Sequence, residues 1–339
     1  LVPVFYNEQY KGQPGYEDIK TVFTIHNLKF QGQYDKIITG DVLGLSGTPA
    51  EGQMLHEDAI NYLQGAVIYC DMVTTVSPTY AQNICTPEYG EGLEGLFQSR
   101  SYKLKGIVNG IDYKEYNPRS DKNIVKNYGP ATLEDKKANK AKLQEMLGLP
   151  VDENVPLFAM VTRMTAQKGM DMVKYLLGDF ANMNMQLAIL GTGDKEYEWA
   201  VRAAANAHPD KISASITFNE SLSRLFYAGA DCFIMPSVFE PCGLAQMMAM
   251  RYGTLPLVRK TGGLADTVDG LWDYGENATG FSFEDADANG LMAAVNQALS
   301  VWENNKELWE RMQQNAMARD FSWPTSAKLY IEMYDELLG

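Results

Sequence analysis

The feature that most constrains the fold is a regular alternation of short apolar runs and longer amphipathic stretches. The apolar runs have the length of strands and are rich in β-branched or bulky side chains. They cover residues 22–25, 72–76, 157–161, 186–190, 232–235 and 255–258. The stretches between them have helical character and cover residues 54–69, 168–177, 195–205, 221–228, 244–252 and 288–302. Strand-then-helix alternation predicts an α/β protein with doubly wound parallel sheets and right-handed crossovers.

The length of 339 residues predicts two domains, because one domain typically holds about 100–200 residues. The boundary is expected where prolines accumulate beside a charged run over residues 133–143, which we interpret as a solvated helix rather than a binding surface. The predicted organisation is a first domain over 1–117, a connection over 118–154, a second domain over 155–320 and a terminal helix within 321–339. Because residues 1–117 offer only three or four convincing strands, the first domain is expected to be incomplete at its N-terminus.

Composition excludes several classes of protein. The chain has 29 Lys and Arg against 43 Asp and Glu, a net charge of −14, which argues against a nucleic-acid partner because such binding requires clustered cations. No apolar stretch approaches the ~20 residues of a membrane span, and no signal peptide is visible. The four cysteines have neither a disulfide nor a zinc-ligand spacing, so a reducing cytoplasm is the expected location.

Polar or glycine-rich loops follow five of the predicted strands. In open α/β sheets ligands bind beyond the carboxyl ends of the strands, so these loops are expected to converge on one site. The loops contain His26, then Arg163 and Lys168, then the segment Gly191-Thr-Gly193, then Glu240 with Cys242, Gly243 and Leu244, and finally Thr261, Gly262 and Gly263.

Each of these features also has a purely structural interpretation. His26 could be a hydrogen-bonded core histidine, and the glycines could serve only tight turns. Arg163 and Lys168 could be surface cations, although their spacing across a strand-to-helix loop would let both reach one anion. Glu240 is the strongest candidate, since a carboxylate at a strand end can bind sugar hydroxyls or offset positive charge on a sugar carbon. The Asp285-Ala-Asp287 segment resembles a metal-binding pattern, but helix capping explains it better.

Several longer segments together carry a resemblance to a known family. They are Thr21-Val-Phe-Thr-Ile-His-Asn-Leu28, Gly106-Ile-Val-Asn-Gly-Ile-Asp112, Arg163-Met-Thr-Ala-Gln-Lys-Gly169, Phe239-Glu-Pro-Cys-Gly-Leu244 and Thr261-Gly-Gly-Leu-Ala-Asp266. The chain resembles bacterial glycogen synthase and plant starch synthase over nearly its whole length. This family extends α-1,4-glucan from ADP-glucose with retention of the α configuration.

The resemblance implies a GT-B fold, in which two Rossmann-like domains face a cleft and the last helix packs on the first domain. Its implied roles are diphosphate neutralisation by Arg163 and Lys168, and binding of the transferred glucose by Glu240 and by His26. It further implies substrate contacts for Asn109, Cys242, Gly243, Leu244, Phe218, Thr261, Gly262 and Gly263. No metal or other cofactor is implied, and the partners are the ADP-glucose donor and the glucan acceptor.

The sequence also departs from the family pattern. Ala245 stands where the family usually has Ser or Thr, and Val238 replaces a usual basic residue. The family's Lys-x-Gly-Gly-Leu loop is absent, so these residues alone are expected not to be a competent synthase. Two alternatives stay open: a GT-B enzyme for another sugar nucleotide, and a noncatalytic glucan-binding fragment.

Overall fold

The computed structural model describes residues 1–339 and divides into two compact units. One unit comprises residues 1–109 and 324–339, and the other comprises residues 110–323. The predicted connection over 118–154 therefore lies inside the second unit, where helix α7 (Lys136–Leu147) packs on helix α10 (Glu220–Gly229). None of the helices is both long enough and apolar enough to cross a membrane.

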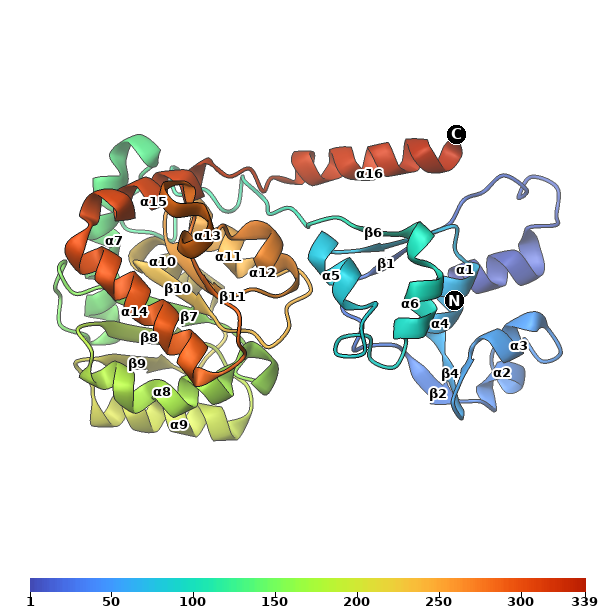
Figure 1. The fold of residues 1–339 in the computed structure, drawn as a ribbon, viewed down its shortest axis with the longest axis horizontal. Helices are drawn as coiled ribbons and strands as arrows, with labels where there is room; N and C mark the ends of the chain where they lie inside the picture. The colour runs from blue at the N-terminus through green and yellow to red at the C-terminus, as the bar shows by residue number, and fades with distance from the viewer. The chain divides into compact units, whose positions relative to one another are not determined.

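The second unit is built on one parallel sheet of six strands in the order β12-β11-β10-β7-β8-β9 (Figure 1). Its strands are β7 (Leu157–Val161), β8 (Gln186–Leu190), β9 (Ile212–Ser215), β10 (Cys232–Met235), β11 (Leu255–Arg259) and β12 (Phe281–Phe283). Its helices, besides α7 and α10, are η3 (Pro130–Asp135), η4 (Ala166–Lys168), α8 (Met170–Asn182), α9 (Lys195–Ala207), α11 (Ala245–Arg251), α12 (Gly262–Thr267), α13 (Leu271–Tyr274), η5 (Gly275–Asn277), α14 (Ala288–Asn304) and α15 (Lys306–Ala318).

The strand order places a topological switch point between β7 and β10. From β7 the chain moves through β8 to β9 in one direction, and β10, β11 and β12 then follow on the other side of β7. Right-handed crossovers therefore put α8 and α9 on one face of the sheet and α10 and α11 on the other. The loops after β7 and β10 diverge to opposite faces, which opens a crevice beyond their carboxyl ends.

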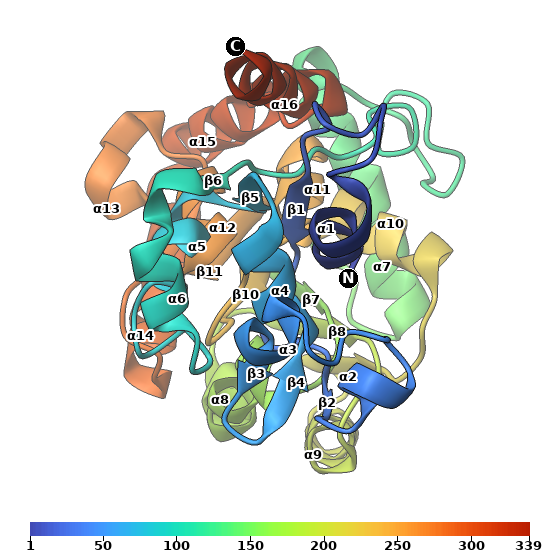
Figure 2. The same ribbon diagram turned by 90° about the vertical axis from the view of Figure 1, so that its right-hand side faces the viewer.

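The first unit has a smaller parallel sheet, in the order β1-β5-β6, and an antiparallel sheet in the order β2-β4-β3. The strands are β1 (Val22–Ile25), β2 (Gln33–Asp35), β3 (Leu55–His56), β4 (Ala59–Asn61), β5 (Met72–Thr75) and β6 (Leu104–Gly106). The helices are α1 (Val2–Phe5), η1 (Tyr6–Tyr10), α2 (Ile38–Asp41), α3 (Pro49–Gln53), α4 (Tyr62–Tyr69), α5 (Pro78–Asn83), α6 (Glu94–Ser99), η2 (Ser101–Lys103) and α16 (Trp323–Leu338). Helices α2 and α3 lie beside the antiparallel sheet (Figure 2).

The terminal helix α16 is held to the first unit by side chains at its two ends. Ser326 donates a hydrogen bond of 2.8 Å to the carbonyl of Val108, and Lys105 pairs with Glu336. Met333 on the same helix is fully buried. Most of α16 therefore belongs to the unit formed by residues 1–109, although the chain reaches it only after completing the second unit.

The helix predicted over residues 54–69 is wrong in its first half. Residues 55–56 and 59–61 form β3 and β4, joined through Glu57 at a φ of 53°, and α4 begins only at Tyr62. Asn61 is the N-cap, accepting a 2.9 Å hydrogen bond from the amide of Gln64. Pairing of β4 with β2 satisfies backbone groups that a helix would otherwise satisfy, so tertiary context overrides the local pattern.

The expected solvated helix over residues 133–143 is also corrected by the structure. Lys136 and Lys140 of α7 are both buried. Lys140 forms a 2.7 Å ion pair with Asp231, and Lys136 donates to the carbonyl of Ala228 and to the hydroxyl of Thr254, both at 2.7 Å. These lysines are buried because carbonyl and carboxylate acceptors at the amino edge of the sheet satisfy them.

Lys136 makes stability depend on pH in a predictable direction. Its burial, opposed by Asp231 and reinforced by Lys140, lowers its pKa from 10.5 to about 7. Between these values the unfolded chain binds more protons than the folded chain, so stability rises with pH. Relative to Lys136→Met, we expect the wild type to gain about 2 kcal/mol in free energy of unfolding from pH 6 to pH 9.

Urea denaturation at both pH values measures this difference. Lys137→Met is the matched control, since Lys137 lies on the same helix with 67% of its side chain exposed, and its pH dependence should equal that of the wild type. Equal pH dependence in the wild type and Lys136→Met would show that Lys136 keeps an ordinary pKa in the folded protein.

Candidate active site

A cavity of about 200 Å³ lies at the switch point, beyond the carboxyl ends of β7 and β10. It brings together five of the sequence-predicted site residues from loops that are far apart in the chain: Arg163, Lys168, Glu240, Gly243 and Leu244. The loop that follows each strand supplies the polar lining residues. The apolar residues at the ends of β7 and β10 line the rest of the cavity.

The centre of the cavity is an ion pair between Lys168 and Glu240. The Lys168 Nζ lies 2.5 Å from the Glu240 Oε2, and the side chains are 18% and 8% exposed. The Ser237 hydroxyl donates a second hydrogen bond, of 3.1 Å, to the same carboxylate oxygen. Each buried charge is thus compensated by the other, and an arriving anion would compete with Glu240 for the Lys168 ammonium.

Backbone pairing fixes this arrangement. The amide of Val238 donates to the carbonyl of Gln167 at 2.8 Å, and the Gln167 side chain donates to the carbonyl of Phe239 at 3.3 Å. The two loops that carry Lys168 and Glu240 are therefore held edge to edge. Arg163 lies on the same rim, but its side chain is exposed and free to meet a ligand.

Gly169 permits the close approach of these loops. Its φ is +74°, and a Cβ there would lie 2.0 Å from the carbonyl oxygen of Pro236. We expect Gly169→Ala to cost about 1–3 kcal/mol of stability, through the strained backbone and the clash. In Gly178→Ala, on the open surface of α8 where nothing lies within 4 Å, a gain of about 0.5–1 kcal/mol is expected. Urea denaturation of both variants tests this, and equal stabilities would contradict it.

The predicted loop that contains Thr261, Gly262 and Gly263 packs against the Glu240 loop. The amide of Gly263 donates to the carbonyl of Glu240 at 3.1 Å, and a Cβ on Gly262 would lie 2.1 Å from that same carbonyl oxygen. Cys242 and Thr261 are buried beside this contact, and the Thr261 hydroxyl has no hydrogen-bond partner. These four residues support the cavity from behind rather than lining it.

Other predicted site residues lie elsewhere. Phe218 precedes α10 and is 89% exposed, outside the cavity lining. His26 follows β1 and is exposed, so its interpretation as a core histidine is wrong, and Asn109 is half-buried after β6. Both belong to the first unit. The Asp287 carboxylate accepts a 2.8 Å hydrogen bond from the amide of Gly290, which confirms that this acidic segment caps α14.

Sequence reasoning missed two polar residues near the cavity. Ser237 orients Glu240, and Gln246 is fully buried, with its amide nitrogen donating to the carbonyls of Cys242 and Gly243 and to the hydroxyl of Thr267. Gln246 thereby ties the Glu240 loop to α12. The available signal for Gln246 was its place in the first turn of a helix that follows a strand-end loop. Polar residues at such positions are common on the exposed faces of helices, so the signal is weak.

Family models and known relatives match this chain. The family model described as starch synthase catalytic domain matches residues 1–99, and the model described as glycosyl transferases group 1 matches residues 142–319. The glycogen synthase of Streptococcus mutans serotype c is 45% identical over 99% of this chain and 71% of its own length. That of Clostridium beijerinckii is 44% identical over 100% and 71%.

A solved structure is also closely similar. The catalytic domain of starch synthase IV from Arabidopsis thaliana, bound to ADP and acarbose, superposes with a TM-score of 0.89 at 33% identity, covering 99% of this chain and 70% of that chain. The fold is GT-B, as the sequence predicts. The chain belongs to the glycogen synthase and starch synthase family of glycosyltransferases.

Proposed function

We propose that this protein transfers glucose from ADP-glucose to the non-reducing end of an α-1,4-glucan, with retention of the α configuration. The observation that carries the proposal is the cluster of charges at the switch point. The two cations Arg163 and Lys168 share one small crevice with the Glu240 carboxylate, which is paired with Lys168. The starch synthase IV relative, with ADP and acarbose bound, supports an adenine nucleotide donor and a glucan-like acceptor.

In this proposal Arg163 and Lys168 hold the diphosphate and stabilise the charge that grows on it as the bond to glucose breaks. Glu240 then accepts hydrogen bonds from the glucose being transferred. The Lys168–Glu240 contact gives this division of roles a physical basis, because the cation and the carboxylate meet where the diphosphate would join the sugar. In this proposal Arg163 and Lys168 neutralise the diphosphate without a metal ion.

The remaining assignments are proposals of the same kind. His26 and Asn109 would contact the sugar and the pocket from the first unit, and the amides near Gly243 and Leu244 would bind the β-phosphate side. Residues 261–263 would support these amides from behind the Glu240 loop, and Phe218, whose side chain is exposed, would lie beside the adenine. The proposal includes a cytoplasmic location, where the four cysteine thiols stay reduced.

The test combines calorimetric ADP binding with incorporation of labelled glucose into glycogen. ADP-glucose should be used in preference to UDP-glucose and GDP-glucose, and ADP should bind more tightly than UDP. Tighter binding of another nucleoside diphosphate would point to a different sugar nucleotide, and glucan binding without nucleotide binding would refute donor recognition. The expectation that these 339 residues do not by themselves complete transfer stays a prediction, and the incorporation assay tests it.

A further inference from the structure

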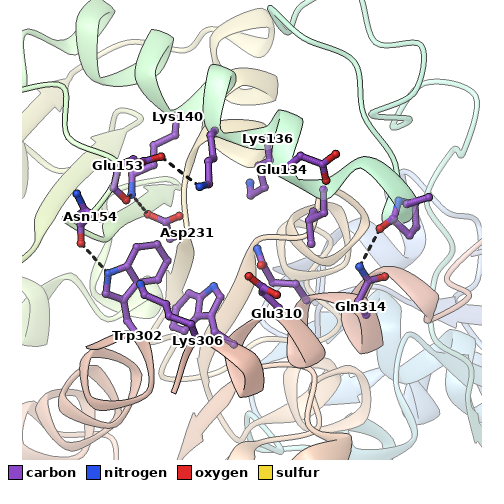
Figure 3. A pocket seen from close by; sticks show the side chains of 16 residues that line it. Glu134, Lys136, Lys140, Glu153, Asn154, Asp231, Trp302, Lys306, Glu310 and Gln314 are labelled. Carbon is purple, nitrogen blue, oxygen red and sulfur yellow. Dashed lines mark hydrogen bonds and ion pairs between the residues drawn. The ribbon is translucent and has the colours of Figure 1, made fainter. Parts of the chain in front are cut away.

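A second cavity, of about 580 Å³, lies at the amino edge of the same sheet, opposite the candidate active site (Figure 3). Asn154 precedes β7 and Asp231 precedes β10, so both mark the edge where these strands begin. One wall comes from α7 and the turn before it, and the other from the end of α14 and the start of α15. The cavity shares no lining residue with the candidate active site.

The end of this cavity near Trp302 holds one ammonium group that no acidic side chain of the protein pairs. Lys140 pairs with Asp231 at 2.7 Å, and this carboxylate also accepts a hydrogen bond from the amide of Leu157. Lys136 is satisfied by carbonyls and a hydroxyl rather than by a carboxylate. Lys137, which also lines the cavity, pairs with Glu153 at 3.3 Å, so Lys306 is the one lining lysine that has neither a carboxylate nor a carbonyl partner.

Lys306 is the group left open to a ligand. Its ammonium lies 3.2 Å from the centroid of the Trp302 ring, and no carboxylate lies within 4.0 Å of it. Burial lowers the pKa of Lys306, Asp231 opposes this effect, and the nearby Lys140 reinforces it. The indole ring positions the cation by a cation–π contact but leaves its N–H donors unpaired.

Trp309 contributes a second unpartnered donor. This residue lines the cavity and is 2% exposed, and its indole N–H is buried without any acceptor. Buried donors are nearly always hydrogen-bonded, so an orphan of this kind requires an explanation. At this end of the cavity the unpartnered groups are thus an ammonium and an N–H, which both need an acceptor-rich ligand.

The geometry favours an anionic head group over a stacked neutral sugar. Trp302 is only 9% exposed and its ring face is held by Lys306, so the ring offers no open platform for stacking. At the other end of the cavity Glu134, Glu310 and Gln314 are exposed, and their acceptors suit hydroxyl groups (Figure 3). The volume matches that of sites for small organic ligands.

We propose that this cavity is a ligand site, separate from the glucosyl transfer site, for a small phosphorylated polyol. Its phosphate binds Lys306 at the Trp302 end, and its hydroxyls face Glu134 and Glu310. Lysine suits this role because it binds phosphate as a point charge without a fixed geometry.

Intrinsic tryptophan fluorescence tests the proposal, because Trp302 and Trp309 both line the cavity. The whole chain is titrated with ribose 5-phosphate, with inorganic phosphate and with ribose, at constant ionic strength maintained with sodium chloride. Ribose 5-phosphate should bind more tightly than phosphate, and ribose should not bind. In Lys306→Ala the affinity for ribose 5-phosphate should fall at least about tenfold.

Two controls separate this site from other cationic surfaces. Lys122→Ala removes an exposed lysine of the same unit and should leave the affinity unchanged. Lys168→Ala disables the candidate active site and should also leave the fluorescence titration unchanged. The proposal is overturned if Lys306→Ala binds ribose 5-phosphate as tightly as the wild type, or if Lys122→Ala loses as much affinity as Lys306→Ala. It is also overturned if the fluorescence change disappears in Lys168→Ala, or if neither phosphate compound changes the fluorescence of the wild type.

Discussion

In a transfer-competent protein that contains these residues, Lys168→Ala should lower the kcat of glucosyl transfer by about a hundredfold to a thousandfold, the cost of removing a preorganised charge that stabilises the transition state. The Lys168 side chain is 18% exposed and is held at the switch point by Glu240 and by the glycine that follows it. In that sheltered position its interaction with a departing diphosphate is stronger than it would be in water. Affinity for ADP should fall as well, since the same ammonium would contact the product.

The matched control for this prediction is Lys174→Ala. Lys174 lies about one turn into α8, its side chain is 41% exposed, and it pairs with Glu196 on the surface. Its replacement should leave kcat within about twofold, because exposed ion pairs contribute little. Arg163→Ala should resemble Lys168→Ala in its loss of turnover. Wild-type rates in either active-site variant would refute the diphosphate assignment.

Glu240→Ala should reduce transfer by about a hundredfold or more while leaving ADP bound, because the carboxylate is assigned to the sugar. The structure sharpens this expectation. Glu240 is paired with the Lys168 ammonium, so removing the carboxylate frees a cation for the diphosphate. ADP affinity in the variant should therefore equal or exceed that of the wild type.

Glu240→Gln separates charge from shape. The amide can still accept the hydrogen bond that Ser237 donates, so the loop should keep its conformation, but the negative charge is gone. Incorporation assays and calorimetry on both variants, with urea denaturation to confirm folding, provide the measurement. If a folded variant lost both its ADP affinity and its transfer activity, this result would show that Glu240 does not act on the sugar side.

The ion pair also explains why truncating either residue has more than one effect. Lys168→Ala leaves the Glu240 carboxylate buried with only Ser237 as a hydrogen-bond partner among these side chains. An uncompensated buried charge destabilises the loop around it. The double variant Lys168→Ala with Glu240→Ala should consequently be more stable than Lys168→Ala alone, even though it is no more active.

Local sequence predicted the strands of the second unit closely. The expected strands over residues 157–161, 186–190 and 232–235 coincide with β7, β8 and β10. These strands are buried on both faces, and a short, fully apolar run is the pattern that such burial imposes. Two strands were missed. The three residues of β12, Phe281–Phe283, form too short a run to give a pattern, and β9, Ile212–Ser215, is mostly small or polar and only partly buried.

Helices that depend on long-range contacts were predicted less well. The lysines of α7 predict a solvated surface from sequence, but Asp231 and the end of α10 lie about ninety residues further along the chain. No local window contains both the lysines and their acceptors. The first half of the 54–69 segment failed for the same reason, since its strand partner β2 lies outside the window.

The sequence by itself determined the strand-and-helix order, the family, and the residues at the carboxyl ends of the strands, because strand burial and loop chemistry are local properties of the chain. Only the tertiary structure decided which of those residues meet. It joined Lys168 to Glu240 across seventy-two residues of separation, placed Phe218 on the surface, and opened a second cavity between α7 and α15. Such contacts depend on the strand order, which sets the distances between loops and which no local pattern contains.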